Sequence, residues 1–379
     1  MTAKPRVLLL SASSGAGHVR AAQALEKAFS ARGDCLVEHM DAMRYASKLF
    51  QSLYDKAYIS MVRRAPKLMG VLYDRTDQPW DHSRRRLALD RLNVQPMIRM
   101  LQRVQPDLCV ATHFLPGEIL AWLIAKKKLR AHNAIVVTDY DVHAMWLCRT
   151  VDRYYVALPE SAEYLAAIGV PREILRVTGI PVDPLFAKSV DRNAVRKHLG
   201  LDPSAPVVLA AAGGEGVGPI EQLVRGLLEL RRPWQIVAIA GKSEKLRKRL
   251  DALSRQAGSL PGGALRLCPV GFTTEMDQYM AAADLLVGKA GGLTTSEALA
   301  RALPMVLIQP IPGQEERNAD HLLEAGAAMR CNNLPVAAWK VARLLDDPAR
   351  LKQMQDAAHR MGRPNAAAEI AQDALALVN

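Results

Sequence analysis

The chain is built largely from short, near-continuous apolar runs, each of which ends in a glycine-containing or polar turn. In the first half these runs cover residues 6–13, 107–113, 134–139 and 153–158. Parallel strands that are covered by helices on both faces have this composition, because neither face of the strand meets water. Helical patterns such as residues 17–33 separate the runs. The sequence therefore predicts a doubly wound α/β sheet.

The second half repeats this organisation after a turn-rich stretch, residues 178–186. Its strand-then-turn units are PVVLAAAGGEG, WQIVAIAGK, LRLCPVGF, ADLLVGKAGG and PMVLIQPIPG. A chain of 379 residues also exceeds the size at which a single core keeps growing. We therefore predict two Rossmann-like domains, residues 1–180 and 181–364, with a final helix over 365–379 that returns to the first domain.

Composition excludes several classes of protein. Hydrophobic residues make up 50% of the chain and charged residues 23%, which does not fit a disordered, collagenous or coiled-coil chain. No apolar run reaches the roughly 18 residues of a membrane span, and the first apolar stretch is too short for a secretory signal. The five cysteines form no CxxC pair. We therefore predict a cytoplasmic protein without a structural metal.

The formal net charge of +12 indicates an anionic partner. Most of the excess lies between Arg44 and Arg103, where 13 basic residues accompany 5 acidic ones and alternate with apolar and aromatic side chains. Such a segment suits an anionic membrane surface, where each basic residue adds about 1 kcal/mol. Nucleic acid is disfavoured, because no recognised nucleic-acid-binding motif accompanies the charge. The alternative is a solvated face of the first domain. The residues that we expect at the membrane include Trp80, Arg84, Arg85 and Arg86.

A glycine-containing turn, SSGAGH, links the first predicted strand to the first predicted helix. Glycines let the backbone approach a ligand, and the helix start offers free N–H groups. Gly15 and Gly17 match only the beginning of a dinucleotide fingerprint. His18 follows at the carboxyl end of the strand, where it is either a general base or a polar residue near the helix start.

Asp139 and Asp141 have the DxD spacing by which some sugar transferases bind Mg²⁺ or Mn²⁺. This spacing is frequent by chance, and it lies here in the basic half, away from the phosphate-like turns. We favour Asp139 as a buried partner that orients a histidine such as His18, with helix capping as the alternative. No metal is expected.

Two polar loops in the second half indicate a nucleotide site. KAGGLTTSE places glycines and threonines at a strand-to-helix turn, where backbone N–H groups bind a diphosphate, and Glu297 can accept hydrogen bonds from ribose hydroxyls. PIPGQEERN supplies Gln314, Glu315 and Asn318 as partners for sugar hydroxyls. The alternative is a pair of well-capped helices, but the density of polar groups favours a ligand.

The motifs SASSGAGHVRAA, VVTDYDVHAMW, TGIPV, GKAGGLTTSEALA and IPGQEERNADHLLEAGAA occur in this order over nearly the whole chain. Together they resemble the diacylglycerol glycosyltransferases, which are related to MurG. The resemblance implies a GT-B fold, in which two Rossmann-like domains face a central cleft. It also implies that the first domain holds the acceptor and membrane, that the second holds a UDP-sugar, and that the reaction is inverting and independent of metal.

The resemblance also implies site residues. His18 falls at the base, and Trp146 at an aromatic position on the acceptor side. The implied donor-binding residues are Gly213, Gly214, Gly271, Phe272, Gly291, Gly292, Leu293, Thr294, Glu297, Gln314 and Glu315. Where the plant enzymes read GGGH, this chain reads GAGH, and the following residue types are closer to the bacterial glucosyltransferases, which favours glucose over galactose.

We therefore expect transfer of a hexose from a UDP-sugar to the hydroxyl of diacylglycerol on the inner face of the cell membrane. His18, oriented by Asp139, would act as the base, and the helix start near Thr294 would stabilise the leaving UDP without a cofactor. The alternatives are a MurG-like transferase with a polyprenyl-linked acceptor, a UDP-sugar 2-epimerase and a non-catalytic nucleotide sensor. The sequence leaves the oligomeric state open.

Overall fold

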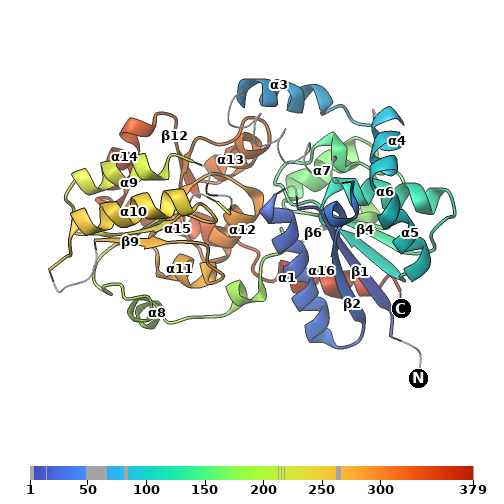
Figure 1. Ribbon diagram of the computed structural model, residues 1–379, viewed down its shortest axis with the longest axis horizontal. Helices are drawn as coiled ribbons and strands as arrows, with labels where there is room; N and C mark the ends of the chain where they lie inside the picture. The colour runs from blue at the N-terminus through green and yellow to red at the C-terminus, as the bar shows by residue number, and fades with distance from the viewer. Residues whose placement is uncertain are drawn as a thin grey trace. The chain divides into compact units, whose positions relative to one another are not determined.

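The computed structural model describes residues 4–13, 15–47, 66–80, 84–211, 213–214, 216, 218–261 and 266–378. They form two compact units. Unit 1 contains residues 1–184, 311–317 and 363–379, and unit 2 contains residues 185–310 and 318–362. The prediction placed residues 311–317 in the second domain, whereas their contacts group them with unit 1. Each unit is a parallel sheet with helices on both faces (Figure 1).

Within the described part of unit 1, the sheet has six parallel strands in the order β2-β1-β3-β4-β5-β6. The strands are β1 (Arg6–Ser11), β2 (Leu36–Asp41), β3 (Leu108–Ala111), β4 (His132–Val136), β5 (Arg153–Val156) and β6 (Leu175–Val177). The strand order reverses between β1 and β3, and ligands of such sheets bind where the order reverses. We did not predict β6, because its three residues lack an apolar run and immediately precede the turn-rich stretch.

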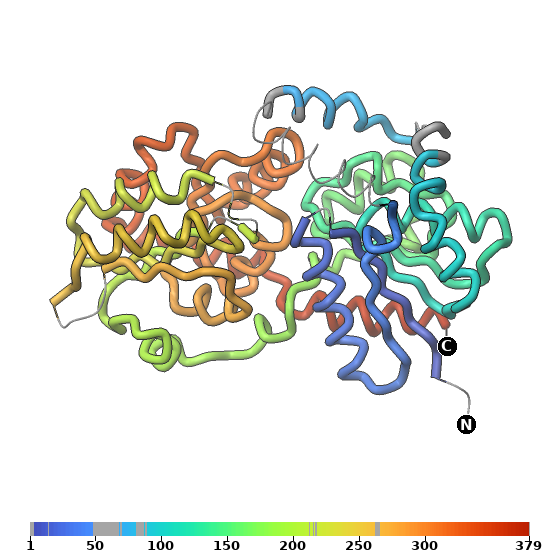
Figure 2. The backbone as a smooth tube through the Cα atoms, in the orientation of Figure 1, coloured from blue at the N-terminus to red at the C-terminus, as the bar shows by residue number. Residues whose placement is uncertain are grey.

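Side chains of β1 alternate between two helical layers, as the period of a strand requires. Val7 and Leu9 pack against α1 and α16, whereas Leu8 and Leu10 pack with α5 and α6. Figure 2 shows α16, in red, beside α1, in blue, although the two lie at opposite ends of the chain. The helices of this unit are α1 (Ala16–Arg32), α3 (Pro66–Thr76), α4 (Arg84–Asn93), α5 (Gln95–Val104), α6 (Phe114–Ala125), α7 (Pro159–Ala167) and α16 (Ala366–Leu375), with short 3₁₀ turns η1 (Ala42–Tyr45), η2 (Ala144–Trp146) and η3 (Arg172–Ile174).

Hydrogen bonds from side chains of β5 and β6 to Asp373 hold α16 against the sheet of unit 1. The Asp373 carboxylate accepts hydrogen bonds from Tyr155 Oη at 2.8 Å, Arg153 Nε at 3.0 Å and Arg176 Nε at 3.1 Å. Burial of the carboxyl opposes ionisation, but the bonds from Tyr155 and Arg176 prevail and lower the pKa of Asp373. The ionised carboxylate therefore stabilises the packing of α16.

Replacing Asp373 by asparagine should lower the thermal unfolding midpoint at pH 7, because charge-assisted hydrogen bonds contribute about 1.5–3 kcal/mol. The folded pKa lies below the unfolded value of about 3.9, so the contribution is complete well above that pH. It is lost as the pH falls through the folded pKa. Circular dichroism melts of wild type and variant from pH 7 to pH 3 should therefore converge in acid. A difference that persists in acid would mean that the charge of Asp373 does not stabilise α16.

Within the described part of unit 2, the sheet has six parallel strands in the order β12-β11-β10-β7-β8-β9, which reverses between β7 and β10. Val208 and Ala210 of β7 pack in one core with residues of α9, α10 and α14. The strands are β7 (Val207–Ala211), β8 (Gln235–Ile239), β9 (Leu267–Val270), β10 (Leu285–Gly288), β11 (Met305–Ile308) and β12 (Ala328–Cys331). Of these, only β12 was not predicted, because Arg330 interrupts its apolar residues.

Helices follow most strands of unit 2. They are α8 (Arg192–His198), α9 (Ile220–Glu229), α10 (Glu244–Ala257), α11 (Met276–Ala282), α12 (Gly292–Ala300), α13 (Gln314–Glu324), α14 (Ala337–Leu345) and α15 (Pro348–Met361), with 3₁₀ turns η4 (Pro184–Ala187) and η5 (Leu334–Val336). The first turn of α13 belongs to the 311–317 segment of unit 1. Among the described helices, none combines the length and the hydropathy needed to cross a bilayer.

Candidate active site

His18 lies at the switch point of the unit 1 sheet, in the first turns of α1. Its Nδ1 is 3.0 Å from the carbonyl oxygen of Thr112, which directly follows β3, and 2.8 Å from Thr138 Oγ1. Because a carbonyl only accepts, Nδ1 carries the proton and Nε2 carries the lone pair. Burial lowers the pKa of His18 to about 4, although the bond to Thr112 opposes this effect. The imidazole is therefore neutral at pH 7 and able to accept a proton at Nε2.

Aromatic side chains surround this imidazole. The His113 ring stands edge-on to the His18 ring with centroids 4.6 Å apart, and the Trp146 ring lies 6.3 Å away. Burial, and secondarily the neighbouring His18, lower the pKa of His113 well below its ordinary value. Trp146 is only 3% exposed, so it forms part of the wall beside His18 and cannot itself contact a membrane.

Asp139 has a different partner from the one we predicted. Both of its carboxylate oxygens accept from Nε2 of Gln314 at 2.8 Å. Since Thr112 and Thr138 hold Nδ1 of His18, the orienting role assigned to Asp139 falls to these two threonines. The other carboxylate of the DxD pair, Asp141, accepts from Arg317 at 2.9 Å. Both carboxylates therefore bind side chains from the first turn of α13.

The glycine pair of unit 2, Gly213 and Gly214, lies two residues after the end of β7, at the switch point of this sheet. Gly213 adopts a left-handed conformation, and its carbonyl accepts from the N–H of Gly216 at 3.1 Å, which closes a tight turn. A Cβ at Gly241, whose φ is +59°, would lie 2.6 Å from the carbonyl oxygens of Gly213 and Gly214. Only glycine at position 241 therefore allows the loops after β7 and β8 to pack backbone against backbone.

The second turn at this switch point connects β10 to α12. The first helical bond runs from the N–H of Thr295 to the carbonyl of Gly291. The N–H groups of Gly292, Leu293 and Thr294 consequently have no acceptor within the helix, which is the arrangement that binds phosphate groups. Glu297 follows one turn later and is 2% exposed, so its carboxylate is held in a restricted position.

The remaining predicted donor residues differ in their surroundings. Phe272, next to Gly271 after β9, is 64% exposed and leaves an aromatic face for a planar ligand. Glu315 accepts from the N–H of Ile311 at 2.7 Å, so one of its oxygens closes the loop before α13. Asn318 Nδ2 donates to the carbonyl of Ala290 at 3.1 Å and thereby supports the turn before α12.

The residues predicted to contact a membrane are only partly described. Trp80 donates from Nε1 to the carbonyl of Ile168 at 2.6 Å, and the guanidinium of Arg149 lies 5.0 Å from its ring centroid, so it packs on unit 1. Arg84, Arg85 and Arg86 form the first turn of α4, but their side chains lie outside the described residues.

Three side chains that we did not single out support the site, and each had a weak signal in the sequence. Thr112 and Thr138 are the first polar residues after two apolar runs, where strands deliver side chains to the ligand edge of the sheet. Arg317 lies within the polar loop PIPGQEERN, next to residues that we did select.

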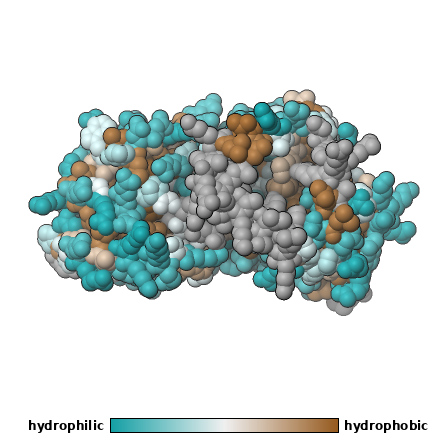
Figure 3. All heavy atoms as spheres, turned by 45° about the horizontal axis from the view of Figure 1, so that its top comes forward, coloured by the Kyte–Doolittle hydropathy of each residue, from teal (hydrophilic) through white to brown (hydrophobic). Residues whose placement is uncertain are grey.

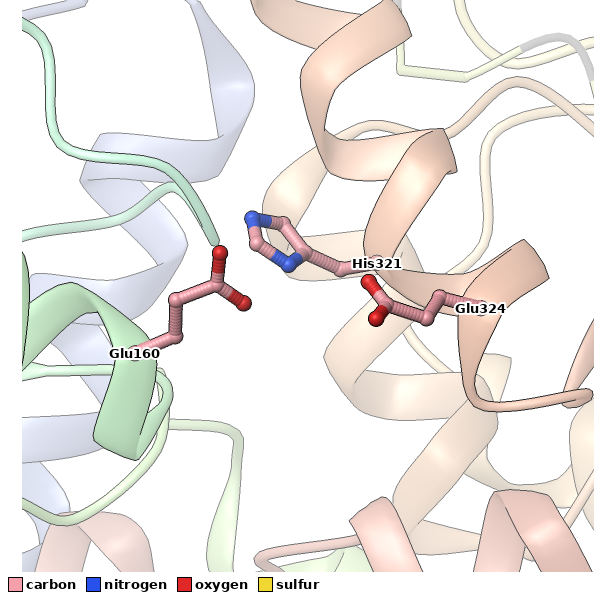
Figure 4. Close-up of side chains that lie close together, drawn as sticks. All are labelled: Glu160, His321 and Glu324. Atoms are coloured by element: carbon pink, nitrogen blue, oxygen red, sulfur yellow. The ribbon is translucent and has the colours of Figure 1, made fainter.

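A group of potential metal ligands receives no role. Figure 4 draws Glu160, which lies on α7, together with His321 and Glu324, which project from α13. Glu160 belongs to unit 1, whereas His321 and Glu324 belong to unit 2. We therefore assign no site to these side chains.

Comparison with known proteins identifies both halves of the chain. Residues 18–182 match the model of monogalactosyldiacylglycerol (MGDG) synthase, and residues 212–373 match the glycosyltransferase family 28 C-terminal domain. The processive diacylglycerol beta-glucosyltransferase of Staphylococcus saprophyticus is 29% identical, over 100% of this chain and 94% of that protein. The probable monogalactosyldiacylglycerol synthase 2 of Oryza sativa subsp. japonica is 30% identical, over 98% of this chain and 80% of that protein.

The crystal structure of MurG from Acinetobacter baumannii superposes with a TM-score of 0.63 at 17% identity, covering 98% of this chain and 99% of that one. Two Rossmann-like units with polar turns at both switch points, together with this likeness, define a protein of the GT-B fold, as predicted. The matches along the chain are more specific than the fold. The chain belongs to the family of diacylglycerol glycosyltransferases that contains the monogalactosyldiacylglycerol synthases and the processive glucosyltransferases.

Proposed function

We propose that this protein is an inverting glycosyltransferase that transfers a hexose from a UDP-sugar to the hydroxyl of diacylglycerol. Membership of the family supports the reaction class and the acceptor. The observation that supports the assignment best is the 3.0 Å contact between Nδ1 of His18 and the carbonyl oxygen of Thr112, because it places the proton on Nδ1 and leaves the lone pair on Nε2. Glucose is the first donor to test, since the relative from S. saprophyticus is named as a glucosyltransferase.

In the proposed reaction, Nε2 of His18 takes the proton of the acceptor hydroxyl. The acceptor oxygen forms a bond to the anomeric carbon on the face opposite UDP. The bond from that carbon to the UDP oxygen breaks at the same time, and its electron pair leaves with UDP. One displacement of this kind inverts the anomeric configuration.

The charge that develops on UDP needs stabilisation where the diphosphate lies. The free N–H groups of Gly292, Leu293 and Thr294 and the positive end of the α12 dipole suit this task. We propose that Glu297 binds the ribose hydroxyls, that the exposed ring of Phe272 faces the uracil, and that Gln314 contacts the sugar. The two hydrogen bonds to Asp139 would then orient the amide of Gln314. Asp139 would therefore be a positioning residue for the sugar contact.

We propose that no metal ion takes part. Both oxygens of Asp139 accept from the amide of Gln314, and Oδ2 of Asp141 accepts from the guanidinium of Arg317. The helix start of α12 supplies positive potential for the diphosphate instead.

The reaction is tested by UDP release from a panel of UDP-sugars in the presence of EDTA, with vesicles that contain or lack diacylglycerol. We expect release that requires diacylglycerol, survives EDTA and selects one sugar. Release that occurs equally without diacylglycerol would contradict the acceptor and favour an epimerase or another acceptor. Loss of release in EDTA, with recovery on adding Mg²⁺ or Mn²⁺, would contradict metal independence.

We further propose that α3 and α4 dock on the anionic inner face of the cell membrane. Leu68, Val71 and Leu72 follow the i, i+3, i+4 spacing of one helical face and are 52%, 47% and 38% exposed. On α4, Leu89 and Leu92 are also exposed. Figure 3 shows hydrophobic surface on the side of the molecule where α3 lies in Figure 1. Apolar residues beside basic ones suit an anionic lipid surface.

Replacing Leu68, Val71 and Leu72 together by serine should weaken sedimentation with phosphatidylglycerol vesicles by about tenfold or more, because burying each such side chain contributes up to about 1.5–3 kcal/mol. Trp339→Ser is the control, since this aromatic residue, which is 58% exposed, lies on α14 of unit 2 and should not affect binding. Unchanged binding by the variant that lacks Leu68, Val71 and Leu72 would exclude α3 as the docking helix.

Replacing Arg84, Arg85 and Arg86 by serine should instead make the remaining binding to vesicles less sensitive to salt.

A further inference from the structure

Helix α3 has a second face, opposite its exposed apolar residues, which packs against the loop before α13. A Cβ at Gly313, whose φ is +85°, would lie 2.6 Å from Cγ of Tyr73, so only glycine allows this approach. Pro312 lies against Gly70 in the same way, at 3.0 Å from the position of a Cβ there. The Tyr73 ring also contacts the His143 ring at a tilt of 51°, with centroids 4.3 Å apart. One short helix thus presents apolar residues outward and holds residues 312–313 with its inner face.

Arg317 connects the first turn of α13 to the end of α3. Its guanidinium lies 2.5 Å from a carboxylate oxygen of Asp77, 2.9 Å from Asp141 and 3.1 Å from Asp74, and 5.1 Å from the centroid of the Tyr73 ring. Burial opposes the charge of Arg317, but the hydrogen bonds that it donates to Asp141 and Asp77 prevail and raise its pKa. The other carboxylate oxygen of Asp77 accepts a hydrogen bond from the backbone N–H of Ala144 at 2.8 Å. Removal of the guanidinium would leave three carboxylates close together, which repel one another.

The same turn of α13 carries the proposed sugar contact. Gln314 precedes Arg317 by three residues, so the two side chains leave the helix on one side. The amide of Gln314 is held by Asp139 and the guanidinium of Arg317 by Asp141, which are neighbours in the loop after β4. Arg317 therefore links the end of α3 to the turn that carries Gln314.

We propose that α3 couples occupation of a lipid surface to binding of the sugar nucleotide, with Arg317 as the positioning residue. The inference rests on the proposed docking of α3 and on the proposed role of Gln314. A bilayer that holds the outer face of α3 would restrict the helix and, through Arg317 and Gly313, the turn that contacts the sugar. Because coupling between two sites is reciprocal, the sugar nucleotide should tighten vesicle binding by the same factor.

The coupling is measured without acceptor, so that turnover plays no part. Affinity for UDP-glucose is determined by calorimetry with and without phosphatidylglycerol vesicles that lack diacylglycerol. We expect vesicles to tighten UDP-glucose binding about fivefold or more, within the range of typical couplings, and to tighten UDP binding less because UDP lacks the sugar. Arg317→Gln should still sediment with vesicles but lose this enhancement. Arg317→Lys, which keeps the charge but not the fork of donors, should retain part of it.

Arg343→Gln is the matched control, because this exposed arginine lies over Trp339 on α14 and should leave the enhancement unchanged. Gly313→Ala gives an independent variant if Arg317→Gln folds poorly, and it should lose the enhancement as well. Wild-type protein that binds vesicles without any change in UDP-glucose affinity would overturn the coupling while leaving docking intact. Wild-type protein that does not bind vesicles would overturn both, and failure to bind UDP-glucose at all would reject the proposed function itself.

Discussion

Replacing His18 by alanine is expected to lower kcat by about two to four orders of magnitude, which is the usual contribution of a positioned general base. Affinity for UDP should stay within about twofold, because the residues proposed to bind the diphosphate belong to α12. The experiment compares initial rates of UDP release on diacylglycerol vesicles with calorimetric binding of UDP. The physical reason for the loss is that Nε2 of His18 is the proposed acceptor for the hydroxyl proton.

The pH dependence gives a second readout of the same residue. Because burial lowers the pKa of His18 to about 4, its imidazole is neutral above that pH. The wild-type kcat/KM should therefore fall in acid through about pH 4 and should show no His18 inflection near 6.5, the ordinary value for histidine. His132→Ala is the control, because this exposed histidine pairs with Asp152 at 3.4 Å and has no proposed part in transfer. Turnover of His18→Ala within a few-fold of wild type would remove His18 as the base.

Replacing Glu297 by glutamine should raise the KM for the UDP-sugar by about ten- to a hundredfold with little change in kcat. A hydrogen bond to a charged acceptor contributes about 1.5–3 kcal/mol, and the amide has only one oxygen to accept from the ribose. The ribose is remote from the bond that breaks, so the contact should help the bound donor and the transition state equally. Steady-state kinetics over a range of donor concentrations measure both constants.

Glu229→Gln is the matched control, because Glu229 is an exposed residue at the end of α9 and should leave KM unchanged. Thermal unfolding without ligand separates loss of binding from loss of structure, since Glu297 is buried. Equal falls in kcat and kcat/KM would mean that Glu297 acts on the transition state rather than on ribose binding. Unchanged kinetics would contradict a ribose contact at this position.

Most of the fold was predictable because a run of consecutive apolar residues indicates a strand that is buried on both faces. The runs at Arg6, Leu108 and Leu285 became parallel strands, since strands covered on both faces need apolar side chains in every position. The strands that we missed, β6 and β12, lie at the edges of their sheets and carry Arg176 and Arg330. An edge strand with a partly exposed face tolerates charge, so its pattern does not differ from that of a loop.

The location of the site was also predictable, because polar residues follow the apolar runs. In a parallel sheet the carboxyl ends of all strands meet at one edge, so His18, Gly213 and Gly291 had to lie at the ligand edges of their sheets. The resemblance of the motifs to diacylglycerol glycosyltransferases then predicted the family, which the comparisons confirm.

The sequence by itself determined the two parallel α/β units, the family and the turns that form the candidate site, because each depends on residues that are close along the chain. The tertiary structure alone decided the partners. Thr112 and Thr138, which hold His18, are 94 and 120 residues away from it, and Arg317 is 176 residues from Asp141. Such pairs depend on which strands become neighbours and on how α3 and the 311–317 loop pack, and no local pattern records that order. This is why Asp139 was assigned to His18 by the sequence and to Gln314 by the structure.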